Sequence, residues 1–283
     1  MSSRMANDDV SAVIPCFNHG SYVREAVDSL LGQEGGAPRI VVVDDGSDVG
    51  STAAALESLP EAVTVLRQAN AGVAAARNRG FEATATPYVL FLDADDRLAS
   101  GALAVLRRAL ERADARIGFA YGHQRFFGEM NGEMRFPPYD PYRLLDRHLI
   151  GPTALMRREL VVDVGGYDPE FRLYEDWEIW INALAHGWRG VRVDTVTHEY
   201  RRAAVSKLAR DRREYRALRR QLREKHAALY RRRDELAKES DLGAAGRLAY
   251  RWFWGPRPVP AGLEAALHRI LWGRRGVLRA ERV

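Results

Sequence analysis

The stretch Tyr88-Val-Leu-Phe-Leu92-Asp93-Ala-Asp95-Asp96 decides the fold that we expect for this chain. Five apolar residues bounded by a polar turn predict a fully buried strand, and ligands of open α/β sheets bind where such strands end. The three carboxylates of this turn repel one another unless a cation neutralises them. A hard divalent ion that also carries phosphate oxygens suits the turn, because such ions take carboxylate ligands and complete their shell with water or substrate phosphate. The alternative is a solvated acidic turn before a helix that begins near Ser100.

Strand and helix patterns alternate over the first 120 or so residues, which predicts a mostly parallel sheet with helices on its faces. Polar or small-residue turns follow three of the strands, at 15–20, 44–47 and 93–96, so we expect these turns to share one edge of the sheet. The expected strands cover 10–14, 39–43, 63–66, 88–92 and 117–121. The expected helices cover 22–31, 51–59, 71–83 and 101–112.

The pattern loosens after residue 122. The pair Asn131-Gly132 predicts a hairpin between 124–127 and 133–136. The prolines of 137–141 predict a loop. Further on we expect a short strand at 151–156, helices at 158–164 and 176–186, and strands at 191–193 and 198–200. One long basic helix is expected from about 203 to 240, because breakers are few there.

The composition is that of a soluble globular protein, with 46% hydrophobic and 29% charged residues among 283. A single cysteine excludes an internal disulfide framework and fits a reducing compartment. No stretch approaches the roughly 20 apolar residues that span a bilayer, and the first nine residues lack the apolar core of a signal peptide. We therefore expect a cytoplasmic protein, with contact to the inner face of the cell membrane as an option.

Charge is distributed unevenly along the chain. Residues 1–200 hold 20 Lys and Arg against 29 Asp and Glu, whereas residues 201–283 hold 23 against 9, a balance of +14. Arginine and tryptophan alternate in this basic tail, as in Arg251-Trp-Phe-Trp254, which suits an anionic membrane interface. Packing on the catalytic domain or on a second subunit is the main alternative. Nucleic-acid binding is the weakest of the three, because no nucleic-acid fold is visible.

Three further motifs carry polar groups that are suited to a nucleotide substrate. Asp44-Asp45-Gly-Ser47 repeats the arrangement of buried strand and acidic turn, and its carboxylates can accept from a base or a ribose; a capped turn is the alternative. Arg77, in a small-residue helix that follows Asn70, can reach a diphosphate with its planar donors; a solvated arginine is the alternative. Glu175-Asp176-Trp177 opens a helix, where a carboxylate can serve as a base or merely favour the helix dipole.

Together these motifs resemble family 2 glycosyltransferases over roughly residues 10–205. The motifs stand in the order expected of that family: Val13-Ile-Pro15-Cys-Phe-Asn18, Val43-Asp-Asp45-Gly-Ser47, Asn70-Ala-Gly72 with Ala76-Arg-Asn-Arg-Gly80, Phe91-Leu-Asp93-Ala-Asp95-Asp96, Gly165-Gly-Tyr-Asp168 and Glu175-Asp176-Trp177. The resemblance implies a GT-A fold, a nucleotide-diphospho-sugar donor, a divalent metal (Mn²⁺ or Mg²⁺) and transfer with inversion. It also implies a catalytic domain over 1–205, with the donor site in 10–122 and the acceptor region and base in 123–205, followed by a basic helical extension over 206–283.

The resemblance also assigns expected roles to single residues. Asp176 is the expected general base, and Asp95 the expected metal ligand. His198 is a candidate second ligand, because the histidine that many relatives carry after a Tyr-Arg pair is absent beyond Tyr200-Arg201. The nucleobase is expected to contact Pro15 and Phe17 and to donate from its ring N–H to Asp45. Arg77 is expected at the base or diphosphate, and Asp93 at the ribose or sugar. Further expected substrate contacts are Asn70, Glu175 and Trp177.

Several functional points stay open. A UDP-sugar is the favoured donor, with GDP- and TDP-sugars as alternatives, and the acceptor is a glycan or a lipid-linked hydroxyl. A homo-oligomer is also possible. The competing hypothesis is a non-catalytic protein that binds sugar nucleotides and has lost turnover. Phosphotransfer through Asp93 is disfavoured, because all three lysines lie in the tail, at 207, 225 and 238.

Overall fold

The computed structural model describes residues 7–202 and 212–254 of the 283-residue chain. Its strands are β1 Val10–Cys16, β2 Arg39–Asp44, β3 Val63–Arg67, β4 Tyr88–Phe91, β5 Arg97–Leu98, β6 Ile117–Gly128, β7 Gly132–Met134, β8 Leu155–Arg157 and β9 Arg189–Arg202. Its helices are α1 Val23–Leu31, α2 Gly50–Glu57, α3 Val73–Glu82, α4 Ala102–Glu111, α5 Pro141–Leu144, α6 Arg158–Asp163, α7 Glu175–Ala185, α8 Arg212–Lys225, α9 Ala227–Arg231, α10 Arg233–Leu236 and α11 Ala244–Trp254, after a 3₁₀ turn at Asn7–Asp9.

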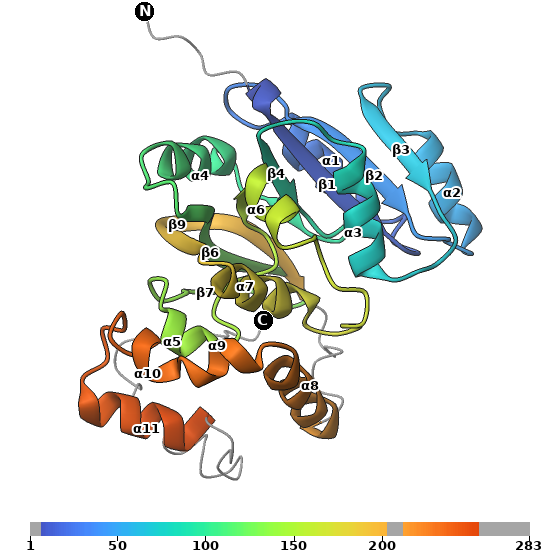
Figure 1. The fold of residues 1–283 in the computed structure, drawn as a ribbon. Helices are drawn as coiled ribbons and strands as arrows, with labels where there is room; N and C mark the ends of the chain where they lie inside the picture. The colour runs from blue at the N-terminus through green and yellow to red at the C-terminus, as the bar shows by residue number, and fades with distance from the viewer. Residues whose placement is uncertain (1–6, 203–211, 255–283) are drawn as a thin grey trace, which may run out of the picture.

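The strands form one mixed sheet in the order β3-β2-β1-β4-β8-β6-β9-β5, with β7 paired to β6 (Figure 1). β1 to β4 are parallel to one another. β8 runs antiparallel to both β4 and β6, so β6 and its parallel partner β9 point the same way as β4. The carboxyl ends of β1, β2 and β4 consequently meet at one edge of the sheet, as the turn pattern predicted.

Side-chain alternation divides the core between the two faces of this sheet. Val13 and Phe91 belong to one apolar cluster, together with side chains of α3, α6 and α7. Their neighbours Ile14 and Leu90 belong to a second cluster, which α1 and α4 cover. The central strands are therefore buried on both faces, which explains why they are continuous apolar runs without polar alternation. Gly80 lets α3 lie close to β1, since a Cβ there would come within 2.3 Å of the Val13 side chain.

The expected strands and helices of the first 121 residues are confirmed, and so is the hairpin of β6 and β7. Two later expectations are wrong, and a third, the proline loop, holds only as far as Asp140. The strands expected at 191–193 and 198–200 are one strand, β9, because the residues between them stay paired to β6 through register shifts. The proline segment contains α5, whose N-cap Asp140 accepts hydrogen bonds from the N–H groups of Tyr142 and Arg143.

The other wrong expectation concerns the basic extension, where three helices replace the single one expected, within the part that the structure describes. The chain turns at His226, whose ring lies 2.8 Å from Glu178 of α7, and again at Arg232. Each turn brings a leucine of the next helix, Leu229 or Leu236, into the cluster that contains Trp180. Tertiary packing thus overrides local helix propensity here.

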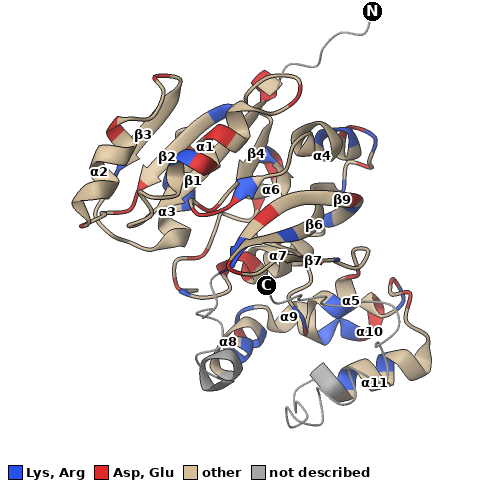
Figure 2. Cartoon of the chain, turned by 180° about the vertical axis from the view of Figure 1, so that it is seen from behind, with Lys and Arg blue, Asp and Glu red and all other residues tan. Residues whose placement is uncertain are grey.

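The described part of the extension packs against α5 and α7 and shares their apolar core (Figure 1). Its basic residues are spread over α8, α10 and α11 (Figure 2). Some of them are ion-paired inside the protein, as Arg219 and Arg223 are with Asp146. No helix among residues 7–202 and 212–254 has the length and apolar character to cross a bilayer.

Candidate active site

The carboxyl end of β2 holds Asp45 in a fixed position. The Asp45 carboxylate is 3% exposed and accepts hydrogen bonds from Gln68 Nε2 and from the backbone N–H groups of Ala71 and Gly72, each at 2.8 Å. It therefore ties down the loop that carries Asn70. Since a carboxylate offers about four lone-pair positions, one stays available for a ring N–H. The base-recognition role expected for Asp45 stays a prediction.

The end of β1 offers an exposed aromatic ring beside this loop. Phe17 is 44% exposed and follows buried Pro15 and Cys16. Asn18, the next residue, adopts a left-handed backbone with φ of 59° and bonds to the turn after β2 through Ser47 Oγ. Phe17 and the exposed Asn70 are accessible to a nucleotide, whereas Pro15 is buried in β1.

Arg77 of α3 links two parts of the site that are far apart in sequence. Its Nη2 donates to Asp93 Oδ1 and its Nη1 donates to Glu175 Oε1, both at 2.7 Å. The guanidinium is 2% exposed and lies 5.0 Å from the ring centre of Tyr167. Arg77 is thus a buried bridge between the turn after β4 and the start of α7. Its expected contact with a base or diphosphate stays a prediction, as does the substrate contact expected for Glu175.

The acidic turn after β4 holds its three carboxylates in different environments. Asp93 pairs with Arg77, and Asp96 is fully buried and accepts from His198 Nε2 at 2.7 Å and from the Arg201 N–H at 2.8 Å. Arg201 also donates from Nε to the Asp95 carbonyl. The Asp95 carboxylate is 35% exposed, with a ring nitrogen of His19 at 3.8 Å.

The environment of Asp95 fits a divalent cation. Burial, followed by the negative charges of Asp96 and Asp93, raises the pKa of Asp95 to about 7, which reports negative charge that the protein does not fully compensate. An exposed oxygen donor in such surroundings is the kind of ligand that Mg²⁺ and Mn²⁺ take. Among the described residues no group of three acidic, histidine or cysteine side chains is placed to hold a metal.

The contacts of His198 argue against its candidate role as a metal ligand. Its Nε2 bonds to Asp96 and its Nδ1 lies 3.0 Å from Gln124 Nε2, so both ring nitrogens are used. The side chain is 1% exposed on β9. His198 instead fixes Asp96 and closes the acidic turn against β9.

The start of α7 presents Asp176 at the site. Its side chain is 14% exposed, and Oδ1 accepts from the Trp177 N–H at 2.9 Å. Burial raises the pKa of Asp176 to about 6, with Arg77 opposing and Asp93 adding to the shift. A carboxylate that titrates near neutrality is suited to general-base work.

Trp177 is fully buried, which argues against the substrate contact expected of it. Its side chain is 0% exposed, and its indole Nε1 donates to the Leu144 carbonyl at 2.8 Å. The first turn of α7 directs this ring into the core, where it supports Asp176 from behind. The neighbouring position Tyr174, with φ of 58°, ends the loop before the helix.

Comparison with known proteins identifies this arrangement. The sequence pattern of Glycosyl transferase family 2 matches residues 11–175 of the chain. The chain belongs to that family. Its sequence relatives include the uncharacterised protein MT1568 of Mycobacterium tuberculosis, 29% identical over 62% of this chain and 61% of its own. They also include glycosyltransferase GlyA of Streptococcus pneumoniae, 28% identical over 73% of this chain and 27% of its own. The chain thus spans less than two thirds of the length of these relatives.

Solved structures confirm the GT-A fold for this family 2 chain. Residues 1–349 of Staphylococcus aureus TarS, in complex with UDP-GlcNAc, have a TM-score of 0.59 at 17% identity, covering 93% of this chain and 73% of that TarS chain. The mannosyltransferase PcManGT of Pyrobaculum calidifontis, in complex with GDP-Man and Mn²⁺, has a TM-score of 0.57 at 22% identity, covering 96% and 82%.

The family 2 motif at 165–168 joins α3 to the loop before α7 through Gly166 and Tyr167. Asn78 Nδ2 donates to the Tyr167 carbonyl at 2.7 Å, and Asn78 Oδ1 accepts from the Tyr167 N–H at 2.8 Å. A Cβ at Gly166, where φ is 78°, would come within 2.6 Å of Asn78 Oδ1. This clamp keeps Arg77 in register with Glu175.

Two histidines of the family 2 site escaped the sequence analysis. His19 lies near Asp95, and His148 Nε2 lies 3.3 Å from Asp176 Oδ2. Neither belongs to a motif quoted above. His148 is 28 positions from Asp176 in the sequence, so no local pattern pointed to it.

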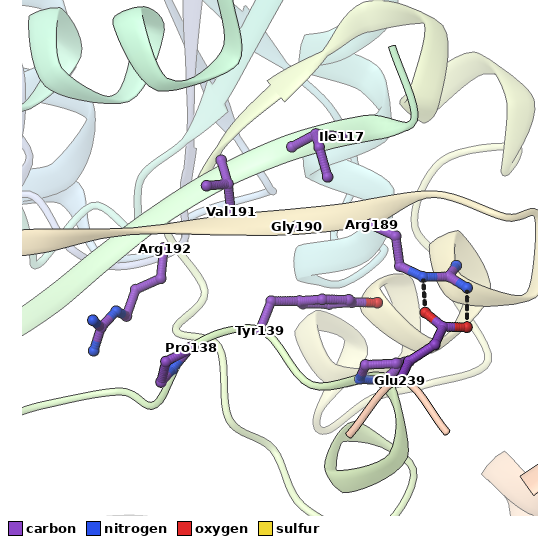
Figure 3. Close-up of a pocket in the computed structure, with 9 residues that line it drawn as sticks. Ile117, Pro138, Tyr139, Arg189, Gly190, Val191, Arg192 and Glu239 are labelled. Carbon is purple, nitrogen blue, oxygen red and sulfur yellow. Dashed lines mark hydrogen bonds and ion pairs between the residues drawn. The ribbon is translucent and has the colours of Figure 1, made fainter. Parts of the chain in front are cut away.

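The cavity of about 400 Å³ in Figure 3 lies elsewhere in this fold. Ile117 and Arg189, which begin β6 and β9, line it together with Tyr139, and Arg189 pairs there with Glu239. Since β6 and β9 run parallel to β4, their first residues lie at the edge opposite the acidic turn. The acidic turn is therefore the better candidate for the reaction site.

Proposed function

We propose that the protein is an inverting glycosyltransferase that moves a sugar from a nucleotide-diphospho-sugar to a hydroxyl group. The observation that carries this proposal is the Arg77 bridge, which holds Asp93 and Glu175 each at 2.7 Å. It links the donor-side turn to the residue next to Asp176 inside one buried ion-pair network. This link supports a common site for donor and base.

The residues divide the work of the reaction. Phe17 and Asp45 would receive the nucleobase, and Asp93 the ribose or sugar. Asp176 would take the proton of the acceptor hydroxyl while the hydroxyl oxygen forms a bond to the anomeric carbon. The bond from that carbon to the diphosphate breaks on the opposite side, and its electron pair leaves with the nucleotide. One carboxylate is enough, because a single displacement needs no covalent intermediate.

A divalent cation, Mn²⁺ or Mg²⁺, would be held by Asp95 and, when bound, would stabilise the charge of the leaving diphosphate. Arg201 keeps the Asp95 backbone in place through its hydrogen bond to the carbonyl. The fully buried Asp96 and its partner His198 would not contact the ion.

The donor assay tests the proposal. UDP-GlcNAc, UDP-glucose, TDP-glucose and GDP-mannose are offered with Mn²⁺, and both the thermal shift and the release of nucleoside diphosphate are measured. The proposal expects one donor to bind and to be turned over. Binding without turnover, across several hydroxyl acceptors, would favour the alternative of a non-catalytic sugar-nucleotide-binding protein. Absence of binding for every donor would overturn both.

We also propose that α11 docks on an anionic membrane surface on the cytoplasmic side, which would suit a lipid-linked acceptor. Leu248 and Trp252, one helical turn apart, are 72% and 70% exposed, and exposed Arg251 lies beside them. The balance of +14 over 201–283 supports an anionic partner. Phe253, Trp254 and the second aromatic segment near Trp272, which the sequence also assigned to this surface, lie outside the side chains that the structure describes.

A further inference from the structure

The imidazole of His148 lies directly against the carboxylate of Asp176. Nε2 is 3.3 Å from Asp176 Oδ2, and the two side chains are 22% and 14% exposed. The Nε2 atom itself is buried and has no hydrogen-bond partner of acceptable geometry in the structure. Buried polar atoms in folded proteins nearly always have partners, so an exception beside a proposed base calls for a functional explanation.

Two aromatic rings fix the orientation of this imidazole. Trp177 stacks on it with ring centres 6.2 Å apart and an interplanar angle of 22°, and Tyr174 meets it edge-on at 6.0 Å. The Trp177 ring is itself fixed through its hydrogen bond to the Leu144 carbonyl. The histidine therefore cannot turn away from Asp176 without breaking this packing.

The basic extension holds the backbone of His148 in place. We call residues 145–150, between α5 and β8, the strap. Tyr230 Oη donates to the Leu145 carbonyl at 2.7 Å. Asp146, fully buried, pairs with Arg219 at 3.2 Å, with Arg223 at 3.1 Å and with Arg233. His148 follows Asp146 by two residues and lies against the proposed base Asp176. The extension therefore supports the candidate active site, in addition to its proposed contact with a membrane.

Burial favours a neutral ring beside an ionisable carboxylate, against the negative charge of Glu175 and a hydrogen bond of the ring to the Ile150 backbone. Glu175 and Asp176 face His148 from α7, while Arg77 on α3 and Asp93 after β4 complete the charged surroundings of Asp176. Burial lowers the pKa of His148 to about 4, against the opposing charge of Glu175. The ring is thus uncharged at neutral pH, when it can either donate to a carboxylate or accept from a carboxylic acid, depending on its tautomer.

With Asp176 taken as the base under the proposed function, we propose that His148 is its positioning residue. The imidazole holds the carboxylate in one orientation, excludes water from Oδ2, and forms a hydrogen bond to it through Nε2 as the acceptor binds. The acceptor proton still goes to Asp176, the acceptor oxygen bonds to the anomeric carbon, and the electron pair of the broken bond leaves with the diphosphate. His148 touches no substrate atom.

Three variants of the 283-residue chain separate the contributions of the ring. His148→Phe keeps the stacking on Trp177 and loses both nitrogens. His148→Gln returns a nitrogen near the Nε2 position, and His148→Ala opens the space to water. The pKa of Asp176 is measured in each by carboxyl ¹³C NMR titration, with Asp176→Asn used to assign the signal. Release of nucleoside diphosphate from UDP-GlcNAc or GDP-mannose with Mn²⁺ gives kcat and KM.

Each variant has a distinct expected result. Water entry in His148→Ala should lower the pKa of Asp176 by one unit or more. Loss of the Nε2 contact without water entry in His148→Phe should shift this pKa by half a unit or more, upward if Nε2 donates to the carboxylate and downward if it accepts from the acid. In His148→Phe kcat should fall at least tenfold at unchanged donor KM, and His148→Gln should recover most of it. An Asp176 pKa that does not change in the Phe variant, or a Phe variant with the parent kcat, would overturn the inference.

The titration needs no donor, so it decides the question whichever donor the protein uses. Full turnover in Asp176→Asn would instead refute the base assignment itself. The two failures are therefore distinguishable, because one appears in the His148 variants alone and the other in the Asp176 variant.

Discussion

Replacement of Asp176 by Asn should make the protein more stable and nearly inactive. The pKa of this carboxyl rises from 3.8 to about 6 on folding, chiefly through burial. A group that binds its proton more tightly in the folded state destabilises the fold once it ionises. Two pKa units at about 1.4 kcal/mol each amount to about 3 kcal/mol. Asn resembles the protonated acid and carries no such cost.

The pH dependence follows from the sign of this shift. Below its unfolded pKa of about 4, the Asp176 carboxyl is protonated in both states and lowers the free energy of unfolding least. The loss of stability grows as the pH rises from there and reaches full size once the pH has passed about 6. Urea unfolding should therefore give Asp176→Asn an advantage of about 3 kcal/mol at pH 8 and below about 1 kcal/mol at pH 4.

Asp176→Asn should lose catalytic activity although it gains stability. Removal of a general base costs roughly 10²–10⁴-fold in rate, while donor affinity should stay within about threefold because the donor contacts are retained. In the parent protein, turnover should increase as the pH rises through about 6, where Asp176 ionises.

Asp168 offers a matched control of opposite sign. Although burial opposes the shift, hydrogen bonds from Lys225 and from the Glu170 N–H hold the pKa of Asp168 below its usual value. Asp168→Asn should consequently lose stability at pH 8. If Asp176→Asn is no more stable than the parent at pH 8, or if it transfers sugar at the parent rate, our account of this carboxylate is wrong.

Three other predictions concern the donor turn, the metal and the membrane. Arg77→Met should cost about 3–5 kcal/mol in urea unfolding, because it leaves two carboxylates unpaired around a buried position, and Arg77→Lys should cost less; equal stability of all three proteins would contradict the bridge. Asp95→Asn should abolish the extra thermal stabilisation that Mn²⁺ adds to bound UDP-GlcNAc or GDP-mannose, and a shift that survives would remove Asp95 as the ligand. A double variant with Ser at Leu248 and Trp252 should bind phosphatidylserine vesicles at least fivefold more weakly in a co-sedimentation assay. Val162→Ser, at an exposed site on α6, should bind them as the parent protein does. Equal binding by both variants would argue against α11 as the docking surface.

The amino-acid sequence determined the framework of this protein, because its signals are local. A buried parallel strand is a short apolar run, and the turn that follows it lies at a fixed edge of the sheet, so Asp45 and Asp93 could be assigned to one edge without coordinates. The start of α7 at Glu175 was predictable in the same way, from acidic residues ahead of an apolar helix.

Tertiary structure alone decided which side chains meet at that edge and which are withdrawn from it. Trp177 is buried and His198 is saturated because their neighbours Leu144 and Gln124 come from other elements. Arg77 meets Glu175 across 98 positions, and His148 lies against Asp176 in a segment that arginines of the extension hold through Asp146. Such contacts depend on packing between elements, and neither hydrophobic period nor turn chemistry encodes a partner that lies so far along the chain.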